Sequence, residues 1–179
     1  MNKLIIISGD LAAGKSTLAI ALSKELSIPC LIKDDMKEIA CDYIGFSNRE
    51  ENRKISAASV AEMIYCFNQM ALVDNDIILE ANFRQEEIDQ ILSIAEENGY
   101  TVYPFELEGN IDLLYDRFLK RLPDRHPAHK TQHLEESKEK FMDVIYEFRN
   151  NIEKYGFIHI NIDNVTTAQL VNNIKSIIR

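Results

Sequence analysis

The stretch at residues 3–17, KLIIISGDLAAGKST, joins a short apolar run to a glycine-containing loop and a helix-forming segment. Residues 4–7 predict a buried strand, and residues from 14 to about 26 predict a helix. Between them, the pattern GxxxxGKS at 9–16 is that of a loop whose backbone N–H groups converge on phosphate oxygens. The dipole of the following helix adds positive potential at the same place. The stretch therefore predicts a binding site for a nucleoside triphosphate.

The residues of this loop have separate expected roles. Lys15 supplies a mobile cation for the β- and γ-phosphates, and the Ser16 hydroxyl is placed to bind a magnesium ion. Asp10 is the unexpected member, because phosphates repel a carboxylate unless its side chain points outward, and we expect it to be solvated. The predicted cofactors are ATP, or alternatively GTP, with Mg²⁺. The predicted nucleotide-binding residues of the loop are Gly9, Asp10, Leu11, Ala12, Ala13, Gly14, Lys15, Ser16 and Thr17.

Short apolar runs alternate with amphipathic helical segments along the rest of the chain. Runs at residues 30–32, 76–84, 100–107 and 157–162 join the first one to give five predicted strands. Such alternation is typical of a parallel sheet with helices on both faces. We predict an α/β fold, the three-layer sandwich of P-loop NTPases with a five-stranded parallel sheet. The 179 residues contain no linker or repeat, which favours a single domain over residues 1–179.

The composition limits the classes of partner. A net charge of −9 argues against a surface for duplex nucleic acid, because such surfaces carry an excess of lysine and arginine. The three cysteines lack a metal-ligand spacing and suit reduced thiols of the cytoplasm. The first apolar run is too short for a signal peptide or a membrane span. We therefore expect a cytoplasmic protein that binds neither duplex nucleic acid nor a membrane.

Two aspartates follow the second predicted strand, at the edge of the sheet where ligands bind in folds of this kind. Asp35 lies three residues before Glu38, the spacing of a capping box, which predicts that Asp35 is a helix N-cap. Asp34 is then free to accept the proton of an attacking hydroxyl or to orient magnesium through water; the alternative is a solvated turn residue. Lys37 can neutralise the transferred phosphoryl group, or it is a surface lysine.

The third predicted strand leads to an acidic residue, Glu80. An acid at this strand end suits the metal side of a nucleotide-binding fold, so we predict that Glu80 holds either a magnesium-bound water or a substrate hydroxyl. Asn82 and Arg84 follow closely and are predicted to contact the acceptor. Asn82 also precedes a helical run, which makes it a candidate helix cap.

A second concentration of positive charge extends over residues 117–133 of this acidic chain. Arg117 and Arg121 are four residues apart and share one helical face. Pro123 and Pro127 then force an irregular segment. The pattern predicts a mobile lid that closes over phosphates and brings arginines to the charge that develops during phosphoryl transfer. The histidines of this segment, expected to be solvated or to act at a hinge, are His126, His129 and His133.

These pieces together resemble P-loop kinases of the AAA-domain type, which group with zeta toxins, chloramphenicol phosphotransferase and the kinase domain of polynucleotide kinase. The resemblance is carried by GDLAAGKST at 9–17, KDDMK at 33–37, LEANF at 79–83, the pair Arg117 and Arg121, and RHPAH at 125–129. It implies that Asp34 is the general base for the acceptor hydroxyl and that Arg121 contacts the donor phosphates. Lys37 stands where polynucleotide-kinase-like proteins carry an arginine, and Glu80 stands where they carry an aspartate.

The residues and the resemblance together predict an ATP-dependent kinase that transfers the γ-phosphoryl group to a hydroxyl of a small-molecule or nucleotide-type acceptor. Two alternatives stay open: a nucleotide-binding switch or slow NTPase that acts through a protein partner, and a zeta-toxin-like kinase of nucleotide-sugars. The switch needs the loop and the metal but not Asp34. The predicted catalytic residues are Lys15, Asp34, Arg121 and Arg117; the metal-binding residues are Ser16, Asp34 and Glu80; the acceptor-binding residues are Asp34, Lys37, Glu80, Asn82 and Arg84.

Overall fold

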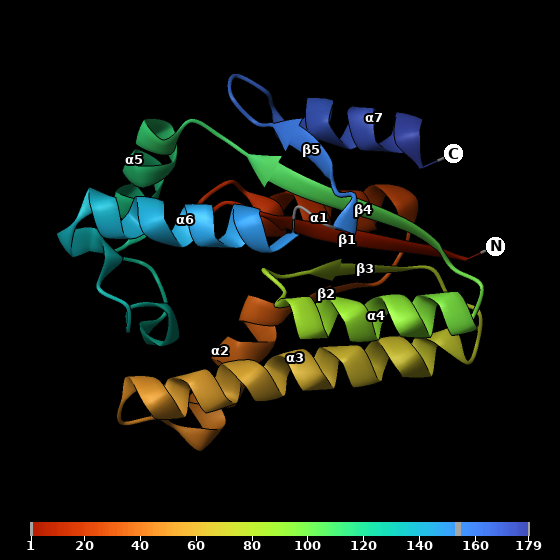
Figure 1. The fold of residues 1–179 in the computed structure, drawn as a ribbon, viewed down its shortest axis with the longest axis horizontal. Coiled ribbons are helices and arrows are strands. Elements are labelled where there is room, and N and C mark those ends of the chain that lie inside the picture. The colour runs from red at the N-terminus through yellow and green to blue at the C-terminus, as the bar shows by residue number, and fades with distance from the viewer. Residues whose placement is uncertain (1, 153–154, 179) are drawn as a thin grey trace.

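The computed structural model describes residues 2–152 and 155–178, which alternate between strands and helices along most of their length (Figure 1). No helix within these residues is long and apolar enough to span a membrane. In chain order the elements are β1 (Lys3–Gly9), α1 (Lys15–Leu26), β2 (Cys30–Ile32), α2 (Lys33–Ile44), α3 (Arg49–Ala71), β3 (Ile77–Glu80), α4 (Gln85–Glu97), β4 (Thr101–Glu108), α5 (Ile111–Arg121), the short 3₁₀ helices η1 (Pro127–His129) and η2 (Leu134–Glu136), α6 (Lys138–Ile152), β5 (Ile158–Asn161) and α7 (Thr167–Ile177).

The strands form one sheet in the order β2-β3-β1-β4-β5, with β1 at its centre. Leu4 of β1 lies opposite Ile77 of β3 on one side and opposite Val102 of β4 on the other. Every neighbouring pair runs parallel, so the carboxyl ends of all the strands meet at one edge of the sheet. The predicted five-stranded parallel sheet is confirmed, and its carboxyl edge is where ligands bind in such folds.

Alternate residues of β1 enter two hydrophobic cores on opposite faces of the sheet. Ile5 and Ile7 pack with side chains of α1, α5, α6 and α7, whereas Leu4 and Ile6 pack with those of α3 and α4. A strand that is buried on both faces needs apolar residues at every position, which explains the unbroken run in the sequence. Figure 1 shows α3 and α4 stacked on one side of the sheet and α7 on the other. This arrangement confirms the three-layer α/β sandwich.

Gly9 ends β1 at a point where the chain has no room for a side chain. A Cβ atom there would lie 2.3 Å from the carbonyl oxygen of Leu107 in β4, and the backbone has a φ of +139°, which favours glycine. The first glycine of the phosphate-loop pattern therefore has a packing reason as well as a conformational one. It lets β1 turn into the loop while staying against β4.

The start of α2 differs from the sequence prediction. The helix begins at Lys33, directly after β2, with Ile32 in the N-cap position. Asp34 and Asp35 thus both lie in the first helical turn, where the positive end of the helix dipole stabilises carboxylates. The prediction that Asp35 is the N-cap was wrong, because the strand passes into the helix without the intervening turn that a capping box requires.

Candidate functional site

The loop between β1 and α1 lies at the carboxyl edge of the sheet and is held in shape by its own lysine. The Lys15 ammonium donates hydrogen bonds to the carbonyl oxygens of Gly9 and Asp10, at 2.8 and 2.9 Å. Gly14 takes the N-cap position of α1 with a φ of +87°, which leaves the first N–H groups of the helix without a side-chain cap. Burial lowers the pKa of Lys15, and this effect outweighs the opposing attraction of Glu80 and other nearby carboxylates.

Ser16 and Glu80 lie in contact next to the loop and provide two oxygen groups that can act as metal ligands. Ser16, in the first turn of α1, donates a hydrogen bond to Oε2 of Glu80 at 2.9 Å. Glu80 ends β3 and is 4% exposed, and burial raises its pKa in spite of the nearby Lys15. A hydroxyl and a carboxylate in contact are ligands that Mg²⁺ accepts, so these two residues fit a magnesium ion at the phosphates.

Asp34 projects from the first turn of α2 and is half-exposed. Its carboxylate lies 3.1 Å from the ammonium of Lys33 and 3.9 Å from Nδ1 of His129. Desolvation alone would raise the pKa of Asp34, but Lys33, His129 and Lys15 together outweigh it and hold the pKa well below its usual range. The group is therefore ionised at neutral pH and able to accept a proton.

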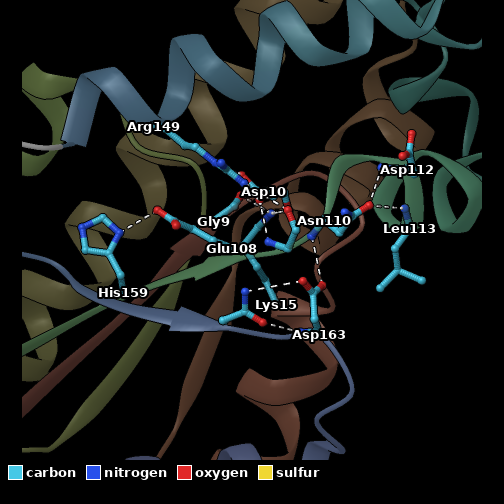
Figure 2. A network of polar contacts seen from close by, with 12 residues as sticks. Gly9, Asp10, Lys15, Glu108, Asn110, Asp112, Leu113, Arg149, His159 and Asp163 are labelled. Carbon is cyan, nitrogen blue, oxygen red and sulfur yellow. Dashed lines mark hydrogen bonds and ion pairs between the residues drawn. The ribbon is translucent and has the colours of Figure 1, made fainter.

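Asp10 is buried, and the prediction that it is solvated was wrong. Its side chain is 1% exposed and forms an ion pair with Arg149 of α6, with Nε of the arginine 3.0 Å from Oδ1 (Figure 2). Oδ2 also accepts a hydrogen bond from the backbone N–H of Gly109 at 3.0 Å. The carboxylate avoids repulsion from bound phosphates because it faces an arginine that the sequence places 139 residues away.

Asn82 forms a hydrogen bond with the start of the phosphate loop and does not cap a helix. Its Oδ1 accepts a hydrogen bond from the backbone N–H of Gly9 at 3.3 Å. The N-cap position of α4 belongs to Arg84, whose own N–H donates to Oε2 of Glu87 at 2.7 Å. The prediction of Asn82 as a cap was wrong, because two residues separate it from the helix and its side chain turns towards β1.

The segment between α5 and α6, predicted as a lid, makes further polar contacts with α2 besides that between His129 and Asp34. The buried ammonium of Lys37 donates to the carbonyl oxygen of Ala128 at 2.9 Å. His129 lies 2.9 Å from Glu38, and His126 lies 3.0 Å from Asp42. Burial lowers the pKa of His129 to about 4, so its imidazole is neutral at pH 7. These contacts hold the segment along α2 and close to Asp34.

A cavity of about 440 Å³ opens beside the loop, and a smaller hollow of about 70 Å³ lies over it. Lys15, Asp34 and Glu80 line both, so the two spaces share one boundary. Of the predicted site residues, those lining one or both spaces are Leu11, Ala12, Gly14, Lys15, Ser16, Thr17, Asp34, Lys37, Glu80, Asn82, Arg84 and Arg121; those lining neither are Gly9, Asp10, Ala13 and Arg117.

Arg125 lines both spaces, and the sequence did not single it out as a site residue. Its guanidinium lies 5.3 Å from the centre of the Phe118 ring, a cation–π contact that fixes its position. Burial lowers the pKa of Arg125. The only sequence signal was its place in the motif RHPAH, because its approach to the loop depends on how the segment folds back from α5.

Glu106 of β4 lies close to this site, beside Ser8, and is 1% exposed. Its Oε2 has no hydrogen-bond partner among the described residues. Burial raises the pKa of Glu106 to about 8, in spite of Lys15 and a hydrogen bond with Ser8. The carboxyl group is therefore mainly protonated at neutral pH.

Glu106→Gln is expected to increase the free energy of unfolding above about pH 8 and to flatten its dependence on pH. Because the pKa rises from 4.5 to about 8 on folding, the folded chain keeps a proton that the unfolded chain releases, and stability falls as the pH rises through this window. Glutamine has nearly the same size and stays neutral. Urea unfolding at pH 6 and pH 9 measures the effect, and an equal loss of stability in variant and wild type would contradict it.

Comparison with known proteins finds solved structures with a similar fold. No protein-family model matches the chain, and no curated protein matches its sequence. A protein from Chloroflexus aurantiacus, provisionally assigned as a kinase, is similar in structure with a TM-score of 0.81 and 23% identity over 99% of both chains. A gluconokinase from Sinorhizobium meliloti has a TM-score of 0.59 and 12% identity, covering 99% of this chain and 98% of its own. The APS kinase of Mycobacterium tuberculosis, solved with AMPPNP and APS, has a TM-score of 0.61 and 13% identity, covering 98% and 96%.

Proposed function

We propose that the chain is a kinase that transfers the γ-phosphoryl group of ATP to a hydroxyl of a small-molecule acceptor. The structural likenesses, the strand order of the sheet and the phosphate loop give the chain the α/β fold of P-loop NTPases. One observation carries the proposal: Lys15, Asp34 and Glu80 line both the hollow over the loop and the adjoining cavity. A phosphate-binding cation, a carboxylate base and a metal-side acid therefore stand at the boundary between a donor space and an acceptor space. A nucleotide switch needs no second space of this kind.

The geometry supports an in-line transfer with one proton acceptor. The nucleotide phosphates bind the loop N–H groups and Lys15. Ser16 and Glu80 would hold a magnesium ion, which would supply positive charge at the phosphates. The acceptor oxygen forms a bond to the γ-phosphorus as the bond to the β–γ bridging oxygen breaks, and its proton passes to Asp34. Arg121 and Arg125 stabilise the charge that develops on the transferred group.

The structural neighbours support this proposal in general terms. One is a gluconokinase, and another is an APS kinase whose structure contains a nucleotide together with APS. A protein of similar fold therefore binds a nucleotide and APS in one complex. A cavity of about 440 Å³ falls within the range of sites for small molecules.

The proposal is tested by following ADP formation from ATP and Mg²⁺ in the presence of candidate acceptors. The panel contains sugars, sugar acids, nucleosides, nucleotides, nucleotide-sugars and hydroxyl-bearing antibiotics. We expect one class to accelerate ADP formation well above the basal rate, with a phosphorylated product that mass spectrometry identifies. A basal rate that no acceptor changes would contradict the kinase and favour the switch, whereas transfer to a nucleotide-sugar would favour the zeta-toxin-like reaction.

Arg125→Ala is expected to lower the rate of transfer about 10²- to 10³-fold, because it removes a preorganised cation that faces the transferred group. The effect should fall on kcat more than on the KM for ATP, since the loop and Lys15 still bind the nucleotide. Lys120→Ala is the matched control: Lys120 is exposed on α5 and lines neither space. Steady-state kinetics with the acceptor found above measures both variants. Equal rates for Arg125→Ala and Lys120→Ala would show that Arg125 takes no part in transfer.

A further inference from the structure

Three arginines line the wall of the cavity formed by the starts of α3 and α4. Arg49 and Arg53 lie one turn apart on α3, and Arg84 precedes α4. Among the described residues, no carboxylate lies within ion-pair distance of these three guanidinium groups, and none of the groups donates a hydrogen bond. In a chain with a net charge of −9, three uncompensated cations at one cavity wall make a local region of positive potential.

The other cations of the cavity already have partners. Lys33 pairs with Asp34, and Lys37 donates to a carbonyl of the lid segment. Lys15 donates to the carbonyls of its own loop, and Arg125 lies over an aromatic ring. The free positive charge of the cavity is therefore concentrated in Arg49, Arg53 and Arg84, which we call the arginine wall.

The placement of the arginine wall runs against local helix electrostatics. Arg49 is the first residue of α3, and Arg84 is the N-cap of α4, so both lie at helix ends that carry positive partial charge. Nearby glutamates do not neutralise them: Glu51 and Glu87 accept hydrogen bonds from backbone N–H groups at these two helix starts, at 2.6 and 2.7 Å. Arginine at these positions costs helix stability, and a negatively charged ligand would offset that cost.

The buried side-chain amide of Asn52, which lies between Arg49 and Arg53 in the sequence, also supports a ligand at this wall. Asn52 is 3% exposed, lines the cavity and precedes Arg53. Its Nδ2 lies 3.9 Å from the sulfur of Cys41, and its Oδ1 lies 3.5 Å from the Thr131 hydroxyl. Both contacts are at the long end for hydrogen bonds, so a shorter hydrogen bond from this amide to an anionic ligand would be more favourable.

From these observations we propose that the acceptor is an anion, and that the arginine wall binds its carboxylate, phosphate or sulfate group. This inference rests on the proposed kinase activity for the role of the bound molecule, but the anion site itself does not. The anionic group lies at Arg49, Arg53 and Arg84, and the reacting hydroxyl faces Asp34. Leu134, Val144 and Phe148 also line the cavity and would contact the apolar part of the acceptor.

The anion site is tested first without turnover, using sulfate as the probe. The protein is saturated with AMPPNP and Mg²⁺ so that the loop is filled, and its Tm is measured with and without low-millimolar sulfate. We expect sulfate to raise the Tm of the wild type and to raise that of Arg49→Ala/Arg53→Ala/Arg84→Ala much less. Lys54→Ala removes the same charge from α3 outside the cavity and should respond like the wild type. An equal response of the triple variant and the wild type would overturn the proposal.

The second test uses pairs of acceptors in which one member is anionic and the other neutral: gluconate against glucose, and adenosine 5′-phosphosulfate against adenosine. We expect transfer only to the anionic member of a pair. Arg53→Ala should raise the KM for that acceptor about tenfold to a hundredfold, with kcat little changed, because a charged hydrogen bond to the ligand is lost. Arg53→Lys should restore part of the affinity, since it keeps the charge without the two-pronged geometry.

The outcomes separate the inference from the proposed function. If the protein phosphorylates a neutral acceptor, and the triple variant has the same KM for that acceptor, the proposal of an anionic acceptor is overturned. The proposed kinase activity is then still supported. If no acceptor is phosphorylated, the proposed function fails. The sulfate measurement then still decides whether the arginine wall binds an anion.

Discussion

Asp34→Asn is expected to lower acceptor-dependent ADP formation about 10²- to 10⁴-fold while nucleotide binding is retained. The substitution keeps the size of the side chain and removes the negative charge with which Asp34 accepts the proton of the acceptor hydroxyl. Lys33, His129 and Lys15 hold the pKa of Asp34 well below its usual range in spite of desolvation, so the group is ionised at neutral pH. The measurements are ADP formation with and without acceptor, and AMPPNP binding by calorimetry.

Asp35→Asn is the matched control for this prediction. Asp35 is the next residue of the same helical turn, is exposed and lines neither the cavity nor the hollow. We expect it to keep the acceptor-dependent rate within about threefold of the wild type, since the charge lost is comparable but does not face the acceptor. If Asp34→Asn retained wild-type stimulation, Asp34 would not be the base. If both variants lost the acceptor-dependent stimulation equally, the cause would be the loss of negative charge in this helical turn and not the loss of a base.

Arg149→Met is expected to reduce the free energy of unfolding by about 3–5 kcal/mol, because it leaves the Asp10 carboxylate buried without its partner. Asp10 is 1% exposed, and the remaining hydrogen bond from the Gly109 N–H cannot replace a guanidinium that binds both of its oxygens. For a chain of this size the loss corresponds to a fall in Tm of about 10 °C. Differential scanning calorimetry and urea unfolding measure it.

The double variant Asp10→Asn/Arg149→Met tests the cause of that loss. Asparagine can still accept the Gly109 hydrogen bond but carries no charge, so we expect the double variant to be more stable than Arg149→Met alone. A double variant as unstable as the single one would show that Arg149 acts through packing of α6 and not through the carboxylate. AMPPNP binding by each variant shows whether the ion pair also positions the phosphate loop (Figure 2).

Local sequence patterns were sufficient to predict the strand and the loop that form the scaffold of the site. The apolar run at 4–7 predicted a strand buried on both faces, and the glycine spacing at 9–16 predicted the loop that follows it; both predictions concern neighbours in the chain. Boundaries were less predictable, because they depend on how far an element remains in contact with others. The third strand ends at Glu80, the acidic residue predicted at its tip, whereas the helix after β2 begins at Lys33 without the predicted capping turn.

The residues that the sequence misplaced or missed are those whose environment comes from distant segments. Asp10 was expected in solvent, but its partner Arg149 approaches from α6, 139 residues along the chain. Arg49 and Arg53 were not among the predicted site residues, yet the packing of α3 brings them to the cavity. Arg125 reaches the loop only because the lid segment folds back over α2. No local periodicity encodes such approaches.

The sequence by itself determined the α/β class, the five parallel strands and the phosphate loop, because hydrophobic periodicity and glycine spacing act over a few residues and do not depend on the rest of the chain. Only the tertiary structure decided which charges remain free to meet a ligand. Burial and polar contacts remove Asp10 and Lys37 from solvent, whereas Arg49, Arg53 and Arg84 have no ion-pair partner among the described residues. A charge contributes to binding only when no other part of the protein has already neutralised it, and that is a property of the folded chain.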